Sequence, residues 1–503
     1  MVNRGLARGL QFWHSRAGRT ALATSLVVTA SFLGWQQLGT NLEALELYVR
    51  DRMIRLNADG SPDPRLLVVG VTEADIQRYR LPLPDSVVAD ALSRLAQAQP
   101  RAIGLDIIRD IPQGEGQAQL LQVLEQNPSI VVVCKVGNRD EIGYPPPPGI
   151  AKERLGFSNL PPDPSGVLRR GLLGVAPPSL PGDLTQNPCQ NPQEPIFSLG
   201  FQLARQYLAV EGIPLTLTAT DEIQLGGLVL PPLTSTDGGY QRADTSGYPI
   251  LLQYRSGDRI AEQVTLSDLL NNRVEPEQIR DRIVLMGYVA ESAKDLFTTP
   301  YSGSQQDNRP MAGVVIHAQL VSQLLRTVLD GEPLPWFWPQ WAEILWIWGW
   351  ALLGGTIGVA LRHPLALGAA TLGATGLCLG TGYLAFLQGG WLLVATPVMA
   401  LATTQAGFML LDRYAQTLSR QIKGLLKLNI EINEAEKNKD VEEIAQSEYF
   451  QQLQQAGQHL KREKSSPKLK ADSSQPDTPG NTANQPADLT PKPCPPDADL
   501  DGH

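Results

Sequence analysis

The chain has 503 residues, a net charge of −9 and a sequence pI of about 5.3, so it is long enough for two or three folded units. This acidic balance argues against nucleic-acid binding, because that function needs a basic face that neutralises phosphates. The four cysteines are too few for a disulfide framework and too widely spaced for a zinc site. We therefore expect no metal and no cofactor. Cys134 and Cys189 form either one disulfide or, as the sequence slightly favours, two buried thiols; Cys378 and Cys494 stay single.

A first apolar segment occupies residues 20–38 and carries no charge. Its length matches the roughly 20 residues that a helix needs to cross a membrane. Four arginines precede it: Arg4, Arg8, Arg16 and Arg19. This positive-inside bias predicts a cytoplasmic N-terminus, residues 1–19. The alternative, a cleaved signal peptide, is disfavoured because no small-x-small cleavage site follows the apolar run.

A second apolar region predicts three further spans, at residues 341–361, 364–387 and 391–411. The breaks between them are short, which is typical of tight helical hairpins. Basic residues lie where four crossings would place them in the cytoplasm: Arg362, Arg413, Arg420, Lys423 and Lys427. The count predicts that both termini are cytoplasmic and that residues 40–335 are outside.

Two small-residue motifs lie within these spans, Gly354-x-x-x-Gly358 and Gly376-x-x-x-Gly380. Such motifs allow two helices to approach closely. They indicate either packing among the spans of one chain, which we favour, or contact between the two subunits of a homodimer.

The segment 40–335 is too long for a loop, and its pattern predicts an α/β domain with a largely parallel sheet. Short apolar runs predict strands: Leu66–Val71, Ala102–Ile108, Ile130–Val136, Leu172–Val175, Ile250–Tyr254 and Ile283–Gly287. Helical spacing of apolar residues predicts helices: Pro84–Ala98, Ile196–Val210 and Val314–Leu329. Leu225–Leu230 followed by Tyr248–Tyr254 predicts an antiparallel addition.

Several pieces of this segment occur in an order that resembles a known family. They are Leu45–Arg52, Leu67–Ile76, Pro100–Ile108, Leu155–Asn159, Asp163–Arg170, Arg282–Gly287, Lys294–Tyr301 and Met311–Leu325. Together with three following spans they are similar to the CHASE2 domain of cyanobacterial-type membrane sensors, over about residues 40–411. The resemblance implies an extracytoplasmic sensory domain in the inner or thylakoid membrane. One departure is Val71-Thr72-Glu73, where such proteins commonly have an Ile-Asp-Glu-like sequence.

Polar residues at the carboxyl ends of the predicted strands are the candidate ligand-binding residues, because that edge is where open α/β sheets bind ligands. They are Glu73, Asp75, Asp106 and Arg109, together with Asp295, which follows the strand Ile283–Gly287 after a short connection, and His317, which begins the last predicted helix. If these strands are neighbours, the carboxylates converge on a small polar ligand or a divalent cation. The alternative is that the acids cap helices or pair with Arg101, Arg109 or Lys294, and that His317 is a core residue.

Asp163-Pro164-x-Gly166 predicts a turn, since Asp and Pro initiate turns and Gly accepts a positive φ. The pair Arg169-Arg170 after the turn either binds an anion or, as we favour, closes the domain internally.

The remaining residues contain no kinase, cyclase or hydrolase motif, so we expect no enzyme activity in this chain. Residues 464–503 are rich in Ser, Pro, Asp and Asn, which predicts disorder. The pattern of residues 412–463 predicts helices. Heptad spacing in the first of them fits a coiled coil and an amphipathic helix on the membrane equally well. A second helix carries Phe450, Leu453 and Leu460 on one side.

Three functions follow. The first is a receptor that senses an unknown extracytoplasmic ligand and signals to a separate cytoplasmic protein. The second is a membrane scaffold without ligand sensing. The third, an extracytoplasmic enzyme, lacks any recognisable catalytic motif.

Overall fold

The computed structural model describes residues 16–38, 41–57, 60–139, 141, 143–179, 187–303 and 310–463. The chain divides into two compact units, residues 1–415 and 416–503. Predictions about Arg4, Arg8, Cys494 and the tail 464–503 lie outside the described residues.

A six-stranded sheet forms the centre of the first unit, and every pair of neighbouring strands in it is parallel. Its order is β12 (Glu262–Thr265), β1 (Leu66–Val71), β13 (Ile283–Tyr288), β2 (Ala102–Asp106), β3 (Ile130–Cys134) and β4 (Leu155–Phe157). The predicted α/β domain with a parallel sheet is confirmed. The pairing of β1 with β13, distant in sequence, places the last strand beside the first.

Helices cover both faces of this sheet, as its apolar strands require. On one face β1 contributes Leu67 and Val69, which pack with α5 (Asp85–Gln97), α6 (Gln117–Gln126) and α8 (Leu266–Leu270). On the other face Leu66 and Val68 pack with α7 (Leu199–Val210) and α10 (Gly313–Leu325). All six residues of β1 are buried, so alternate side chains serve the two cores.

Smaller antiparallel sheets surround this centre, and they differ in detail from the prediction. Leu172–Val175 is divided between β5 (Arg170–Leu172) and β6 (Gly174–Val175), because these strands pair with different partners. β6 pairs with β7 (Ile196–Phe197), so the predicted helix 196–210 begins only at Leu199. β5 pairs with β11 (Pro249–Leu251), whereas β8 (Leu215–Leu217), β9 (Ile223–Leu225) and β10 (Leu228–Leu230) form their own sheet.

Four apolar helices accompany the sheet domain in the first unit. α11 (Gln340–Ala360) and α12 (Pro364–Leu387) are long and apolar enough to cross a membrane, and Leu22–Gly34 and Ala395–Leu411 are shorter apolar stretches. The first of these stretches lies in α2 (Arg16–Leu38) and the second in α13 (Ala395–Gln446). The third predicted span of the second region begins late, at Ala395, because Gly390–Trp391 form strand β17, which pairs with β16 (Trp336–Phe337).

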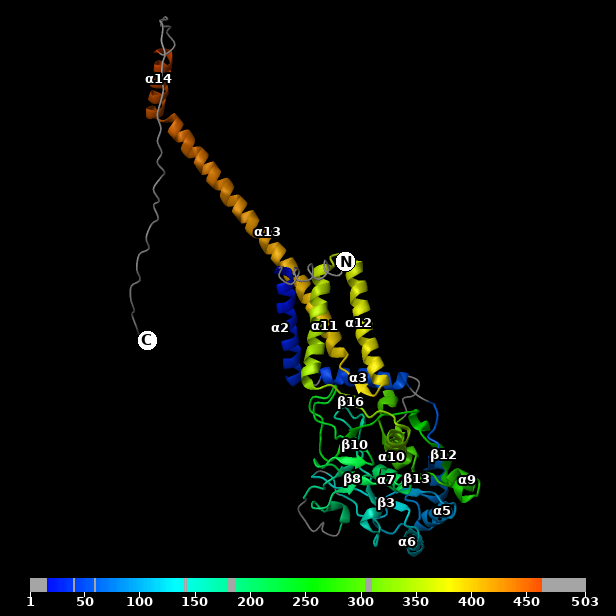
Figure 1. Ribbon diagram of the computed structural model, residues 1–503. Helices are drawn as coiled ribbons and strands as arrows, with labels where there is room; N and C mark the ends of the chain where they lie inside the picture. The colour runs from blue at the N-terminus through cyan, green and yellow to red at the C-terminus, as the bar shows by residue number, and fades with distance from the viewer. Residues whose placement is uncertain are drawn as a thin grey trace, which may run out of the picture. The chain divides into compact units, whose positions relative to one another are not determined.

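A helix that the pattern analysis did not predict, α3 (Asn41–Leu56), follows α2. Figure 1 shows α3 lying across the ends of α2, α11 and α12, between these helices and the sheet domain. Leu42 packs with the apolar helices, whereas Ile54 belongs to the core of the sheet domain. α3 therefore contacts both parts of the first unit.

The two glycine motifs have different surroundings. A Cβ on Gly354 would lie 2.2 Å from the backbone oxygen of Leu401, and one on Gly358 would lie 3.5 Å from that of Gln405. This motif therefore packs α11 against α13 within the chain, as we favoured. Among the described residues, no atom lies within 4 Å of a Cβ placed on Gly376 or Gly380.

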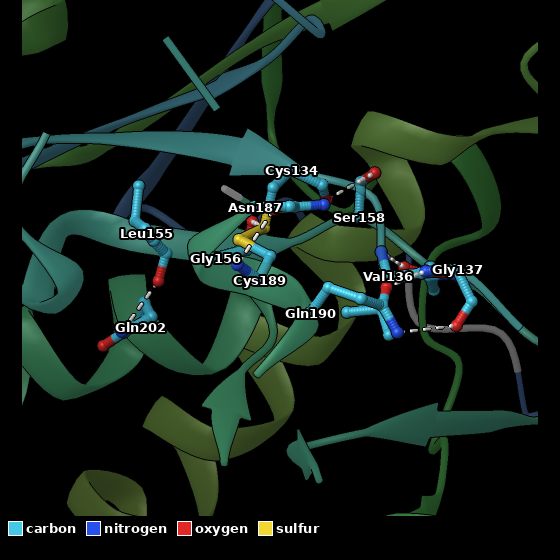
Figure 2. Close-up of a disulfide and its surroundings, with 11 residues drawn as sticks. Cys134, Val136, Gly137, Leu155, Gly156, Ser158, Asn187, Cys189, Gln190 and Gln202 are labelled. Carbon is cyan, nitrogen blue, oxygen red and sulfur yellow. Dashed lines mark hydrogen bonds between the residues drawn. A yellow bond between two sulfur atoms is a disulfide. The ribbon is translucent and has the colours of Figure 1, made fainter. Parts of the chain in front are cut away.

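Cys134 and Cys189 form a disulfide with a Cα–Cα distance of 6.5 Å, which corrects our preference for two thiols (Figure 2). The bridge joins the end of β3 to a short helical turn, Pro188–Gln190. In that turn the side chain of Gln190 accepts a hydrogen bond from the backbone N–H of Gly137 at 2.8 Å. Cys378 is a buried free thiol. The pairing was hard to predict because the two cysteines are 55 residues apart.

In the second unit, α13 continues to Gln446 and α14 spans Glu448–Glu463, as the predicted pair of helices. On α14, Phe450 and Leu453 are exposed. The heptad side chains Tyr414, Leu418, Leu425, Leu428 and Ile432 lie outside the side chains that the structure describes, so the coiled coil stays a prediction.

Candidate functional site

A cavity of about 470 Å³ lies at the carboxyl ends of four neighbouring strands. Asp106 is the last residue of β2, and Tyr288 is the last of β13; Lys135 follows β3, and Ser158 follows β4. The cavity is completed by Asp295 and by the first turns of α10, including Gly313 and His317. Four of the six predicted residues, Asp106, Arg109, Asp295 and His317, thus line one cavity.

The cavity's two carboxylates are costly to ionise. Burial raises the pKa of Asp106 to about 7, and only 8% of the residue is exposed. Burial and, secondarily, the neighbouring Asp106 raise the pKa of Asp295 to about 7. Near neutral pH these acids are therefore partly protonated, and any cation placed between them would favour their charged forms.

Asp295 is positioned against the start of α10. A Cβ on Gly313 would lie 2.6 Å from its carboxylate oxygen Oδ2, so only glycine leaves room there. The backbone N–H of Gly313 also donates to the backbone oxygen of Asp295 at 3.0 Å. An anion at this end of α10 is favoured by the helix dipole.

His317 is 1% exposed on α10, and its Nε2 lies 4.0 Å from the carboxylate oxygen Oδ1 of Asp106. Burial lowers its pKa to about 4, which the carboxylate of Asp295 and the backbone of Ser158 only partly offset. Neither ring nitrogen makes a hydrogen bond of normal geometry with the described residues. The ring is therefore neutral at physiological pH and has unused hydrogen-bonding capacity beside two acids.

Arg109 also lines the cavity and is 3% exposed. Its Nη1 donates to the backbone oxygen of Leu83 at 2.7 Å and lies 3.3 Å from the carboxylate of Asp85. Its Nε and Nη2 have no partner among the described residues. The predicted pairing of Arg109 with Asp106 or Asp295 is not seen; its ion partner is Asp85.

Glu73 and Asp75 lie away from this cavity and follow the alternative prediction. Asp75 forms a capping box with Thr72 at the start of α4 (Glu73–Tyr79) and accepts a 3.0 Å bond from the backbone N–H of Ser267. Glu73 accepts bonds from the backbone N–H and the hydroxyl of Ser292, at 2.8 and 2.9 Å. Both carboxylates are thus occupied in fixing local structure.

Sequence reasoning did not place five polar residues in the cavity: Lys135, Tyr144, Ser158, Tyr288 and Lys294. Lys135 also pairs with Glu141 at 2.9 Å. Lys135 lies near the end of the predicted strand Ile130–Val136, as Asp106 does in Ala102–Ile108, but this signal was not used for Lys135. A second cavity of about 830 Å³ shares Lys135, Ser158 and Asp295 with the first.

A buried ion network connects α3 to the sheet domain. Arg169 binds the carboxylate of Asp51 through two bonds, of 2.9 and 2.8 Å, and donates to Asp163 at 2.9 Å. Arg170 and the hydroxyl of Tyr240 donate to the same Asp163, at 2.7 and 2.9 Å. The predicted turn is present, with Gly166 at φ +78°, and the arginine pair closes the domain rather than leaving an anion site.

Glu46 lies on α3 nearer the N-terminus of that helix than Asp51, and it is 2% exposed. Its carboxylate accepts hydrogen bonds from the backbone N–H groups of Val394, Ala395 and Thr396, at 3.0, 3.2 and 2.7 Å. These groups open α13, so Glu46 satisfies a helix N-terminus that would otherwise be unpaired. Burial raises the pKa of Glu46. Asp51 and Glu46 thus attach α3 to the sheet domain and to α13, respectively.

The cavity suits a bound polar molecule better than a metal ion. No group of three or more potential ligand residues among the described parts of the chain is close enough to hold a metal. The divalent-cation alternative therefore has no cluster of ligands among the described residues to support it, whereas His317 and Arg109 have buried hydrogen-bonding atoms without partners there. What the site offers is two acids, a neutral imidazole and nearby cations.

Comparison with known proteins gives one match: the sequence profile of the CHASE2 domain matches residues 23–356. No curated protein and no solved structure matches the chain. CHASE2 domains are extracellular sensor domains, typically on membrane proteins, and the two long apolar helices fit such a protein. The match covers well over half of the sequence and includes the complete sheet, the cavity and α3. The chain belongs to the CHASE2 domain family.

Proposed function

We propose that the protein is a membrane receptor that binds a small polar ligand in the cavity at the strand ends and transmits binding through α3 to α13. The observation that carries this proposal is the convergence of Asp106, Asp295 and His317 in one cavity, where burial raises the pKa of both acids and neither ring nitrogen of His317 has a hydrogen-bond partner among the described residues. Buried polar groups without partners are costly in a protein that has no ligand for them.

The charges of the cavity define the class of ligand. Asp106 and Asp295 match a cationic group such as a protonated amine, while Lys135 and Lys294 match a carboxylate or another anion. A small zwitterion, such as a free amino acid, has both. Binding of its amine would lower the pKa of both acids, because an opposite charge favours the ionised form, so protons should be released on binding.

The contacts of α3 support a mechanical relay. Movement of the sheet domain would act on α3 through Arg169 and Asp51, and α3 would act on α13 through Glu46. Both attachments consist of buried, charge-assisted bonds, which resist stretching more than exposed contacts do. A shift between two packings of the apolar helices then alters α13, which continues to Gln446.

The proposed topology has four crossings, with residues 40–335 outside and both termini in the cytoplasm. The Cys134–Cys189 bridge supports it, since disulfides persist in oxidising compartments. A separate cytoplasmic protein supplies the enzymatic output, and the receptor acts as a homodimer, in the inner or thylakoid membrane.

A thermal-shift screen of the full chain in detergent tests the binding step, with a panel of amino acids and polyamines. A ligand that binds only the folded state raises the melting temperature. We expect a saturable shift that Asp106→Asn and Asp295→Asn abolish and that the matched control Glu73→Gln keeps. No shift across the panel, from a chain that melts cooperatively, would favour the scaffold function instead.

A further inference from the structure

A separate cavity of about 290 Å³ lies where the sheet domain meets the end of α12. Its polar lining includes Arg50 from α3, Arg255 and Arg326. Its apolar lining includes Phe386 and Leu387, the last residues of α12, and Trp391. The ligand cavity described above is lined by different residues.

Arg50 is a buried cation without a counter-ion. It is 4% exposed; its Nη2 donates to the backbone oxygen of Leu252 at 3.4 Å, and its guanidinium stacks 5.0 Å from the ring centre of Trp391. Among the described residues, its Nη1 has no hydrogen-bond partner and no carboxylate forms an ion pair with Arg50. A buried charge that is left unpaired is strongly unfavourable, so the position calls for an anion.

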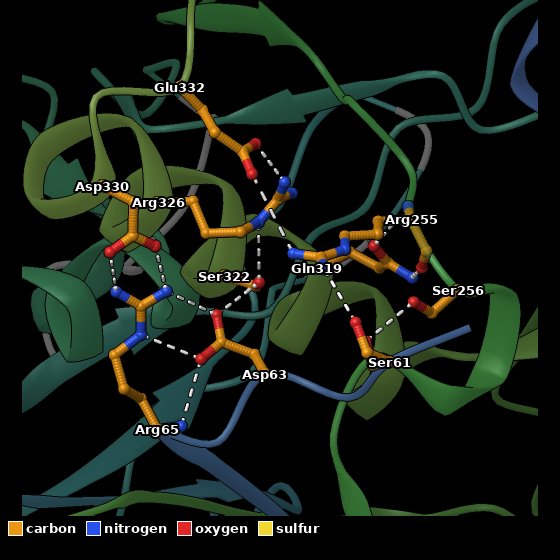
Figure 3. A network of polar contacts seen from close by, with 10 residues as sticks. All are labelled: Ser61, Asp63, Arg65, Arg255, Ser256, Gln319, Ser322, Arg326, Asp330 and Glu332. Carbon is orange, nitrogen blue, oxygen red and sulfur yellow. Dashed lines mark hydrogen bonds and ion pairs between the residues drawn. The ribbon is translucent and has the colours of Figure 1, made fainter. Parts of the chain in front are cut away.

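The other two arginines of the cavity share one carboxylate, which does not balance the charge of all three. Figure 3 shows Arg326 and Arg255 reaching the same carboxylate, that of Glu332. Arg326 also donates to Ser322 at 3.2 Å, but its Nη2 has no partner among the described residues. Three arginines and one glutamate line the cavity, so the lining carries a net charge of 3 − 1 = +2.

Burial also lowers the pKa of Arg50 to about 10, which the more distant carboxylates of Asp51 and Asp163 only partly offset. The guanidinium nevertheless stays protonated at physiological pH. Arg169, another buried arginine of this unit, differs from Arg50 because it donates to two carboxylates, those of Asp51 and Asp163.

We propose that this cavity binds a phosphate group, and that the group is the headgroup phosphate of an anionic membrane lipid. Guanidinium groups bind phosphate oxygens through two parallel bonds, and basic pockets beside membrane helices are suited to lipid headgroups. The apolar lining formed by Phe386, Leu387 and Trp391 accommodates the start of the acyl chains, and indole rings favour this depth of the membrane. The assignment rests on the proposed membrane placement and is independent of the ligand cavity.

Native mass spectrometry of the full chain, released from detergent micelles, tests this assignment. The probes are short-chain phosphatidylglycerol and inorganic phosphate, added separately and in competition. The variants are Arg50→Gln and the milder Arg50→Lys, which keeps the charge but loses the two-pronged geometry. Arg52→Gln is the matched control, because Arg52 lies on the exposed side of the same helix, bonded to Tyr48.

We expect wild type and Arg52→Gln to retain phosphatidylglycerol, and Arg50→Gln to bind it at least about tenfold more weakly, as loss of a charge-assisted bond predicts. Arg50→Lys should fall between them. Equal retention of inorganic phosphate, lost in the same variants, would identify free phosphate as the source of the group.

Equal retention of the lipid by wild type and Arg50→Gln, or no retention of either probe by the wild type, would overturn the proposal. Such a failure would leave the amino-acid screen unaffected. Conversely, Asp106→Asn should retain phosphatidylglycerol normally even if the screen finds no ligand, so the two proposals fail separately.

Discussion

Two groups of buried charge in the first unit differ in how completely they are paired. Around Arg169, each acid and base has a partner at 2.7 to 2.9 Å. Around Asp106, the nearest ionisable partner is the ring of His317 at 4.0 Å, and both His317 nitrogens lack hydrogen bonds to the described residues. A complete network fixes one arrangement of the chain, whereas an incomplete one leaves capacity for a ligand. The first therefore serves to connect elements and the second to bind.

Breaking the complete network should have the largest effect. Arg169→Met leaves Asp51 and Asp163 buried without their cation, and we expect it to lower the free energy of unfolding by about 3–5 kcal/mol. Chemical denaturation of the detergent-solubilised chain measures this loss. Arg94→Met is the control: its partner Asp90 lies on the solvent-facing surface of the same helix, and such pairs are worth about 0.3–0.5 kcal/mol. Equal effects of the two variants would contradict the comparison.

Loss of the disulfide between Cys134 and Cys189 should have the second-largest effect on stability. Replacing Cys134 and Cys189 by alanine frees a loop of 55 residues, and we expect a loss of about 2–4 kcal/mol. Reducing agent should lower the melting temperature of the wild type and leave the double variant unchanged. Insensitivity of the wild type to reductant would show that the bridge does not form.

For the incompletely paired cluster around Asp106, we expect a substitution to stabilise the protein, the opposite of the two preceding predictions. The native pKa of Asp106, about 7, exceeds its ordinary 3.8, so the native state holds more protons and stability falls as pH rises through this window. Asp106→Asn removes that loss and should raise the free energy of unfolding at pH 8 by on the order of 2 kcal/mol. His317 has the reverse shift, to about 4, and its contribution changes only below about pH 6.5.

Chemical denaturation of Asp106→Asn and of the wild type between pH 6.5 and 8 therefore separates the contribution of the Asp106 carboxylate to stability from that of His317. Asp90→Asn, on an exposed helix surface, is the control and should show no pH-dependent gain. If Asp106→Asn destabilised the protein at pH 8, the carboxylate would have a partner that the account does not contain.

Glu73 should give the smallest effect. Its exposed carboxylate binds Ser292 and lies outside the cavity, so Glu73→Gln should leave ligand-induced melting shifts unchanged. The same screen that detects ligand binding measures this. A lost shift in Glu73→Gln would extend the site to the end of β1.

Sequence patterns predicted the parts of this molecule in which local chemistry and tertiary structure agree. Leu66–Val71 and Ile283–Gly287 are continuous apolar runs, and both are strands of the sheet. Because the carboxyl ends of parallel strands meet at one edge, the sequence predicted that Asp106 and Asp295 converge if their strands are neighbours, and one cavity contains both, with His317.

Other features depended on contacts between distant residues. Glu46 and Asp51 on α3 are polar residues with no local partner, and their roles appear only when Thr396 and Arg169 are brought beside them. Asp75 was misplaced in the binding set because a capping carboxylate after a strand has the same local pattern as a ligand-binding one. The four-residue delay of the last apolar helix likewise depends on the pairing of β17 with β16.

The central claim is that binding in the cavity acts on α13 through α3, and hydrogen–deuterium exchange tests it most directly. The full chain is compared with and without the panel compound that gives the largest melting shift, in wild type and in Asp51→Asn. The account predicts that the compound changes exchange in β2, α3 and the first turns of α13 in the wild type. In Asp51→Asn the change in β2 should persist and the change in α13 should disappear. An unchanged α13 in the wild type, or an equal change in both proteins, would contradict the relay.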